Sequence, residues 1–193
     1  MEKIFDKSSA LKNEKFLISE IIAGKIFIYP TDTLYGLGIN ALEGKYIEKI
    51  RSLKKRDAKP FLIIAPGLEW IWKNCIIPNN KARAILTKKL PGSYSFILKI
   101  KNKKAVSHLA ISEKETIGVR LPDHWFSEII SKSGIPFIST SVNISGKDSG
   151  IFFDQLSKEL KEAADYQIKD DAILGRPSTI IDLTDGKEEI LRA

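Results

Sequence analysis

The chain has 193 residues, of which 43% are hydrophobic and 28% charged, a composition typical of a folded globular domain. Its formal net charge of +7 favours anionic partners such as nucleotides or RNA. No apolar run approaches the roughly 20 residues of a membrane span, and the first residues lack a signal-peptide core. The single cysteine cannot form an internal disulfide. We therefore expect one cytoplasmic domain over residues 1–193, without a membrane segment.

Helical and strand patterns alternate along the chain. An apolar stripe predicts a first helix that ends at Gly24, and Ile26–Tyr29 reads as a buried strand. The next helix should end near Lys55, because Pro60 disfavours helix at the residue before it. The further expected elements are a strand over Phe61–Ala65, helices over Leu68–Lys73 and Asn80–Lys89, strands over Tyr94–Ile100 and Thr116–Leu121, a helix over His124–Ser133, a strand over Pro136–Thr140, a helix over Phe153–Ala164, a weak strand near Gln167–Ile173, and closing segments Ser178–Leu183 and Glu189–Arg192.

This alternation, without repeats or long linkers, predicts a single α/β domain with a mixed sheet flanked by helices. Polar stretches stand at the ends of its predicted strands, where open α/β sheets bind ligands. The first, in the run YPTDTLYGLG, carries two hydroxyls and a carboxylate, more polar groups than a turn requires. The stretches are Pro30–Gly38, Lys54–Pro60, Arg120–Pro122, Ser139–Gly146 and Pro177–Thr179.

Two of these stretches have the composition of a phosphate site. Neither a P-loop nor a dinucleotide fingerprint is present, but a basic cluster and a Ser/Gly-rich loop can bind phosphates without them. Lys54–Arg56 and Ser141–Gly146 supply those ingredients. The residues favour neither a metal centre nor a Ser–His–Asp triad, since His124 is expected to cap its helix and His108 to lie on the surface. Cys75 is expected to be a small buried hydrophobe.

Taken in order, the motifs resemble the YrdC/Sua5 family of threonylcarbamoyl-AMP synthases, which start the tRNA modification t6A. The similarity runs from about Gly24 to Arg192, nearly the whole chain. The motifs are PTDTLYGLG, KKR with a following KP, PGSYSFIL, VRLP, STSVNISG, STIID and the closing ILR. The family has a histidine in some members where Ile64 stands here, and S-A-N appears as Ser141-Val142-Asn143. The length matches the short, single-domain type.

The resemblance implies a twisted YrdC/RibB-like sheet around a positively charged central cavity. It implies that L-threonine and bicarbonate (or CO2) form a carbamate that attacks the α-phosphate of ATP, with Mg2+ on the phosphates and pyrophosphate as product. Expected partners are these substrates, the t6A-transfer proteins downstream and, through the basic surface, tRNA.

The resemblance also implies site residues, at the matching positions of this sequence. Lys54 and Arg56 are the expected catalytic residues. The expected nucleotide contacts are Arg56, Lys59, Thr116, Ser141, Asn143, Ser149 and Arg192. The expected threonine contacts are Thr31, Ser139, Ser178 and Arg120, whose guanidinium can hold a carboxylate with two parallel hydrogen bonds.

Two other functions remain open at this point. A non-catalytic RNA-binding module in tRNA or ribosome maturation would use the basic surface, although no RRM or KH signature is present. A carbamoyl-transfer domain like that of hydrogenase maturation proteins would need zinc-finger and acylphosphatase-like segments, which this sequence does not show.

Overall fold

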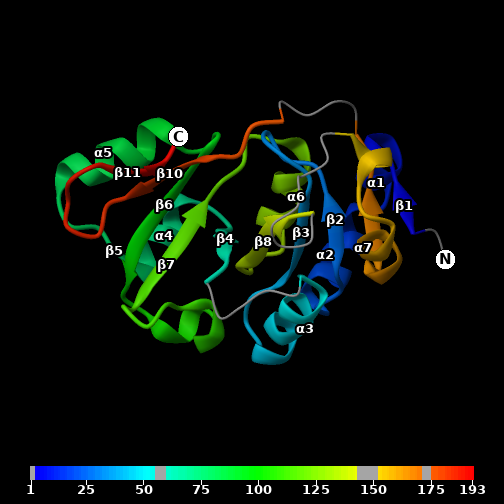
Figure 1. The fold of residues 1–193 in the computed structure, drawn as a ribbon, viewed down its shortest axis with the longest axis horizontal. Coiled ribbons are helices and arrows are strands. Elements are labelled where there is room, and N and C mark those ends of the chain that lie inside the picture. Colours follow the sequence, from blue (N-terminus) through cyan, green and yellow to red (C-terminus); the bar gives the residue numbers. More distant parts are fainter. Residues whose placement is uncertain (1–2, 55–59, 143–151, 171–174) are drawn as a thin grey trace.

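The computed structural model describes residues 3–54, 60–142, 152–170 and 175–193. One mixed sheet runs across the molecule, and the two chain ends lie at opposite sides of it (Figure 1). Its strand order is β1-β9-β2-β3-β8-β4-β7-β6-β10-β11, with β5 paired to β6. The strands are β1 (Ile4–Phe5), β2 (Phe27–Tyr29), β3 (Gly36–Asn40), β4 (Leu62–Ile64), β5 (Cys75–Ile76), β6 (Tyr94–Ile100), β7 (Thr116–Arg120), β8 (Phe137–Ser141), β9 (Tyr166–Ile168), β10 (Thr179–Asp182) and β11 (Glu189–Arg192).

Helices cover both faces of the sheet, as expected. They are α1 (Lys7–Lys12), α2 (Glu14–Ile22), α3 (Gly44–Lys54), α4 (Leu68–Asn74), α5 (Asn80–Lys89), α6 (Trp125–Lys132) and α7 (Lys158–Ala163). One core cluster joins buried side chains of α3, α4, α5 and α7 to one face of the sheet. A second cluster joins α1, α2 and α6 to residues of the other face, among them Tyr29, Ile64 and Phe137. The α/β fold with a mixed sheet and flanking helices is therefore confirmed.

Most predicted elements form close to their expected bounds, and the differences are local. The segment after Pro30, read from the sequence as a polar loop, contains β3, which pairs antiparallel with both β2 and β8. The predicted helix over 153–164 is a 3-10 turn at Phe153–Gln155 followed by the shorter α7. The weak strand near 167–173 is observed as β9, and its last three residues lie outside the described ranges.

Among the described residues, no helix is long and apolar enough to cross a membrane.

Candidate functional site

A cavity of about 530 Å³ lies on the sheet face that also carries the second core cluster. Its floor is one row of residues across four strands, because residues directly opposite one another in a sheet point to the same face. In this row Ser139 is paired with Leu62, Leu62 with Gly118, and Gly118 with Ile97. A Cβ added to Gly118 would come within 2.5 Å of Leu62 Cδ2, so this glycine keeps the floor low. The parallel and antiparallel pairing of β8, β4, β7 and β6 thus builds the cavity.

Hydroxyl groups and two arginines form the polar walls of this cavity. They come from segments far apart in the sequence: the turn after β2, the end of β8, the start of β10, the end of β7 and β11. A small polar ligand could be surrounded by hydrogen-bonding groups here. The polar lining residues among those described are Thr31, Thr33, Arg120, Ser139, Thr140, Ser141, Ser178 and Arg192.

The turn after β2 is held by the side chain of Thr31. Its Oγ1 accepts the backbone N–H groups of Thr33 at 3.1 Å and Leu34 at 3.2 Å, and donates to the Leu34 carbonyl at 2.8 Å. A threonine in this role replaces backbone hydrogen bonds and fixes a tight turn. The turn leads straight into β3, so it presents Thr31 and Thr33 at the cavity wall.

Arg120, the last residue of β7, is held by this same turn. Its Nη2 lies 2.6 Å from Asp32 Oδ1, and its Nη1 donates to Thr33 Oγ1 at 3.1 Å. Both charged side chains are buried, with 6% and 9% of their surface exposed. Burial lowers the pKa of Arg120, the nearby Asp32 carboxylate raises it, and the charge of Arg192 lowers it again. Arg120 is therefore a buried cation with one built-in counter-ion.

Arg192 reaches the cavity from β11, the strand that closes the sheet. Its Nη2 and Nε donate to the carbonyl of Ser178 at 2.8 and 3.2 Å. The hydroxyl of Ser178 in turn lies 2.8 Å from Ser95 Oγ. Partial burial lowers the pKa of Arg192. The closing motif of the chain thus supplies a cation to the same cavity wall as Arg120.

Tyr29 orients the side chain of Ser139. The phenol of Tyr29, which is fully buried, donates to Ser139 Oγ at 2.7 Å. Burial raises the pKa of Tyr29 well above its ordinary value, and the Ser139 hydrogen bond lowers it only in part. Tyr29 therefore stays a donor at all physiological pH values. Because the Ser139 oxygen already accepts one hydrogen bond, its own proton is available to an acceptor on a ligand in the cavity.

Replacing Tyr29 by phenylalanine tests this orientation. We expect Tyr29→Phe to lower the free energy of unfolding by about 1 kcal/mol, the typical net worth of one hydrogen bond. We also expect a several-fold higher dissociation constant for L-threonine, the ligand that the resemblance implies, because the Ser139 hydroxyl can then rotate. Urea denaturation and isothermal titration calorimetry measure the two effects. An unchanged threonine affinity would show that the Tyr29 hydrogen bond does not orient Ser139 for the ligand.

Lys54 lies at the end of α3 and is almost fully buried, with 2% of its surface exposed. Its Nζ donates to the carbonyl oxygen of Ser141, at the end of β8. This contact joins the two points at which the chain leaves the described structure before residues 55–59 and 143–151. The first of these segments is followed by Pro60, which lines the cavity. Described residues that flank both segments, Pro60 and Ser141, therefore line the same cavity.

The structure brings together most of the described residues that the sequence singled out. Six of them line the cavity: Thr31, Arg120, Ser139, Ser141, Ser178 and Arg192. Lys54 contacts the wall through Ser141, and Arg56, Lys59, Asn143 and Ser149 lie outside the described residues.

Thr116 is placed elsewhere. It opens β7 at the end away from Arg120, and its hydroxyl pairs with Ser112 Oγ at 2.6 Å. It is not among the lining residues of the cavity. Ile64 is also absent from this lining, because it packs into the second core cluster.

Sequence reasoning did not assign a role to Asp32, Thr33 or Tyr29. Asp32 and Thr33 stand inside the polar run that drew attention to this loop, but only the fold shows that they meet Arg120. Tyr29 was read as the end of a buried strand, which it is, and its hydrogen bond to Ser139 spans 110 residues of sequence. The only signal in the sequence is that Tyr29 stands two residues before Thr31, the first of the two threonines in this run.

The remaining candidate groups have structural roles. His124 caps α6 as expected, accepting the Phe126 N–H at its Nδ1, and His108 is exposed. Cys75 is buried, and burial raises the pKa of its thiol to about 12, so it is not a ready nucleophile. Among the described residues, no group of His, Cys, Asp and Glu side chains could hold a metal ion.

Known proteins share the sequence pattern and the fold of this chain. The Sua5/YciO/YrdC family model, described as telomere recombination, matches residues 19–193. A putative threonylcarbamoyl-AMP synthase of Methanocaldococcus jannaschii is 39% identical over 90% of this chain and 81% of that protein. The uncharacterised protein YciO of Escherichia coli is 28% identical over 88% of this chain and 82% of its own.

A solved structure shows the same fold with a ligand. Sua5 of Pyrococcus abyssi, crystallised with L-threonine, superposes with a TM-score of 0.88 at 25% identity. The match covers 98% of this chain but only 56% of that longer one. The family model and the archaeal relative both extend over most of the sequence. The chain therefore belongs to the Sua5/YciO/YrdC family.

Proposed function

We propose that this protein is a threonylcarbamoyl-AMP synthase acting in t6A biosynthesis. The observation that carries the proposal is the cavity itself, whose walls combine hydroxyls with Arg120 and Arg192. Threonine offers a carboxylate, an amine and a hydroxyl, and each finds hydrogen-bonding groups of the required kind there. The names of two relatives, the putative threonylcarbamoyl-AMP synthase of Methanocaldococcus jannaschii and the threonylcarbamoyl-AMP synthase of Pyrococcus abyssi, support the same activity.

The residues suggest a division of labour within the cavity. Arg120 takes the threonine carboxylate with N–H groups that Asp32 and Thr33 leave free, since a guanidinium carries five donors. The hydroxyls of Thr31, Ser139 and Ser178 contact the rest of the amino acid. Arg192, Ser141 and Lys54 mark the nucleotide side, next to the segments that carry Arg56, Lys59, Asn143 and Ser149.

The reaction needs no covalent enzyme intermediate. The neutral threonine amine adds to CO2 and loses one proton to solvent, which gives a carbamate anion. One carbamate oxygen then attacks the α-phosphorus of ATP while pyrophosphate leaves. Catalysis of this kind rests on holding two anions in line and on stabilising the charge that develops on the phosphoryl oxygens. We propose that Lys54, Arg56 and Arg192 supply the positive charge that stabilises the phosphoryl oxygens. The shared cavity would hold the two anions in line, as a nucleotidyltransferase requires.

Magnesium is expected to arrive on the substrate. The described lining residues include no carboxylate, the ligand that Mg2+ prefers in proteins. We therefore propose that Mg2+ accompanies the phosphates of ATP and that these residues bind the complex through cations and hydroxyls.

Pyrophosphate release tests the proposed function. We expect purified protein with ATP and Mg2+ to release pyrophosphate only when threonine and bicarbonate are both present, and mass spectrometry to find threonylcarbamoyl-adenylate in the mixture. Serine in place of threonine is the matched control, because it lacks only the methyl group. Equal release with serine, or with no amino acid, would show that the substrate is wrong.

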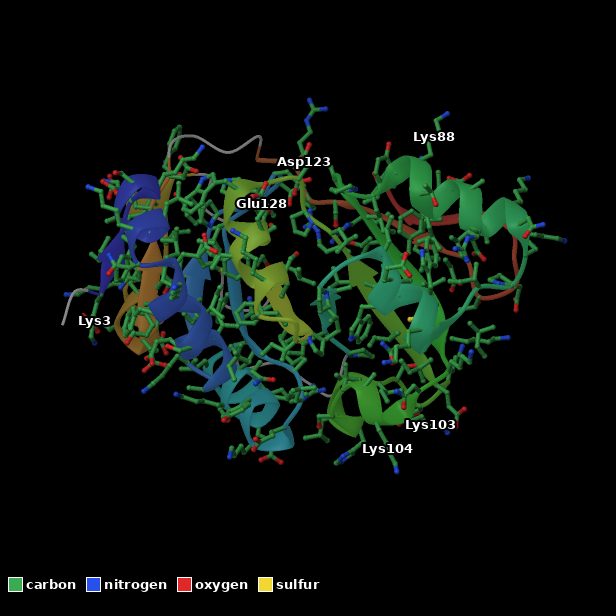
Figure 2. The ribbon with its side chains drawn as sticks, turned by 180° about the vertical axis from the view of Figure 1, so that it is seen from behind. Lys3, Lys88, Lys103, Lys104, Asp123 and Glu128 are labelled. Carbon is green, nitrogen blue, oxygen red and sulfur yellow. The ribbon has the colours of Figure 1, made fainter. Side chains whose placement is uncertain are left out.

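An RNA-binding module is the less favoured alternative. Figure 2 shows Lys3, Lys88 and the pair Lys103 and Lys104 on separate parts of the molecule, so these cations do not form one docking face. Binding through the surface would weaken by about 10³-fold or more between 50 and 200 mM salt if six or more phosphates were contacted. ATP binding in the cavity should vary far less. We place the enzyme in the cytoplasm and propose that tRNA and the t6A-transfer proteins act after it.

A further inference from the structure

Asp32 lies next to the cavity with 9% of its side-chain surface exposed, but it is not among the lining residues. Its two carboxylate oxygens are held by different parts of the chain. Oδ1 lies 2.6 Å from Arg120 Nη2 at the end of β7, and Oδ2 accepts the hydroxyl of Ser93, before β6, at 3.2 Å. The backbone on either side is fixed by the Thr31 turn. A carboxylate held from three directions determines where its partner cation lies.

These contacts fix the orientation of the Arg120 guanidinium. One N–H of Nη2 is directed to Asp32 and one of Nη1 to Thr33, while Nε has no hydrogen-bond partner among the described residues. Two of the five N–H groups of the guanidinium are thus used, and the other three can donate to a further acceptor. A ligand at Arg120 therefore meets a compensated cation of fixed orientation rather than a free positive charge.

This arrangement matters because carboxylates and phosphates compete for arginine. A guanidinium binds both with the same bidentate geometry. The repulsion from Asp32 grows with the charge of the ligand, so it is strong for a polyphosphate and small for a zwitterion without net charge. Arg192 lines the same cavity and would add to the attraction of phosphate if Arg120 were uncompensated.

We propose that Asp32 is a positioning residue that reserves Arg120 for the amino-acid carboxylate and keeps polyphosphate away from it. The proposal rests on the proposed function, since it assumes that an amino acid and a triphosphate share the cavity. It explains why a carboxylate stands among the hydroxyls of the first motif. Without it, ATP and pyrophosphate would bind in the place of threonine.

Asp32→Asn removes the charge and keeps the shape. We expect the dissociation constant for L-threonine to rise by about tenfold to a hundredfold, the usual effect of losing a charged hydrogen bond. The dissociation constant for inorganic pyrophosphate should fall, and pyrophosphate should become a competitor of threonine. Isothermal titration with each ligand alone, and with both, gives these values. Weaker binding of both ligands would overturn the proposal, because a merely structural role would have that result.

Two controls show whether the effect of Asp32→Asn depends on the place of Asp32 beside Arg120 or follows from the loss of any negative charge. Asp123→Asn removes an exposed carboxylate on the surface seen in Figure 2 and should change neither affinity. Asp32→Asn made in an Arg120→Gln background should cause no further change in either affinity, since Asp32 acts through Arg120. Full additivity in this cycle would contradict the proposal.

A further variant covers the case in which Asp32→Asn does not fold. Asp32→Glu keeps the charge but displaces the guanidinium, so threonine should bind more weakly while pyrophosphate affinity stays at the wild-type value. Tighter pyrophosphate binding by this variant would contradict the proposal. Failure of the proposed function would look different: wild-type protein would not bind threonine, whereas the pyrophosphate arm would still report on Asp32.

Discussion

Arg120→Ala is expected to lower the free energy of unfolding by about 3–5 kcal/mol, the range for breaking a buried ion pair on one side. The Asp32 side chain, 9% exposed, would keep only the Ser93 hydroxyl as a partner among the described residues. For a domain of this size the loss corresponds to a fall in Tm of about 6–20 °C. Threonine-dependent pyrophosphate release should disappear as well, because the carboxylate loses its cation.

A double variant shows whether the uncompensated charge of Asp32 causes the loss of stability in Arg120→Ala. Asp32→Ala in the Arg120→Ala background removes the stranded carboxylate, so it should restore part of the lost stability while activity stays absent. Urea denaturation of the two variants and of wild type gives the difference, provided that the m-values agree. If the double variant is less stable than Arg120→Ala by the amount that Asp32→Ala costs alone, the two residues are not coupled.

Much of the fold could be predicted because its elements follow local rules. The helix over Asn80–Lys89 and the strand over Tyr94–Ile100 were predicted with the bounds that the structure shows. Gly24 ends its helix with a φ of +74°, a conformation that favours glycine. β3 was missed for a physical reason: its alternate residues Gly36 and Gly38 give no apolar pattern, and its place is decided by pairing with β2 and β8.

The site was predictable only as far as motif order allowed. Order and residue type indicated Arg120 and Ser178, and the fold brings both to one cavity although 58 residues separate them in the numbering. Their partners could not be predicted, because Asp32 meets Arg120 and Ser95 meets Ser178 only through the strand order of the finished sheet. Thr116 lies at the opposite end of the same strand from Arg120, where it pairs with Lys99, and this register keeps it out of the cavity.

Lys54→Met should almost abolish pyrophosphate release and change stability much less. Methionine fills a similar volume, so the end of α3 can stay packed, but it cannot donate to the Ser141 carbonyl. Losing one preorganised cation near a reacting phosphate typically costs about 10²–10³ in kcat. We therefore expect a fall of about that size at saturating threonine, measured as pyrophosphate release.

The sharper test is whether Lys54→Met lowers turnover without weakening the binding of threonine. Lys54 contacts the end of β8, which we propose to be the nucleotide side, whereas Arg120 lies at the end of β7. Lys54→Met should therefore leave the threonine dissociation constant close to wild type. Lys73→Met, at an exposed lysine on α4, is the matched control and should keep full activity. If Lys54→Met weakened threonine binding as much as turnover, the lysine would serve the shape of the whole cavity. Its burial and its contact with the Ser141 carbonyl support the proposal that this lysine is a cation held in place for the phosphates of the nucleotide.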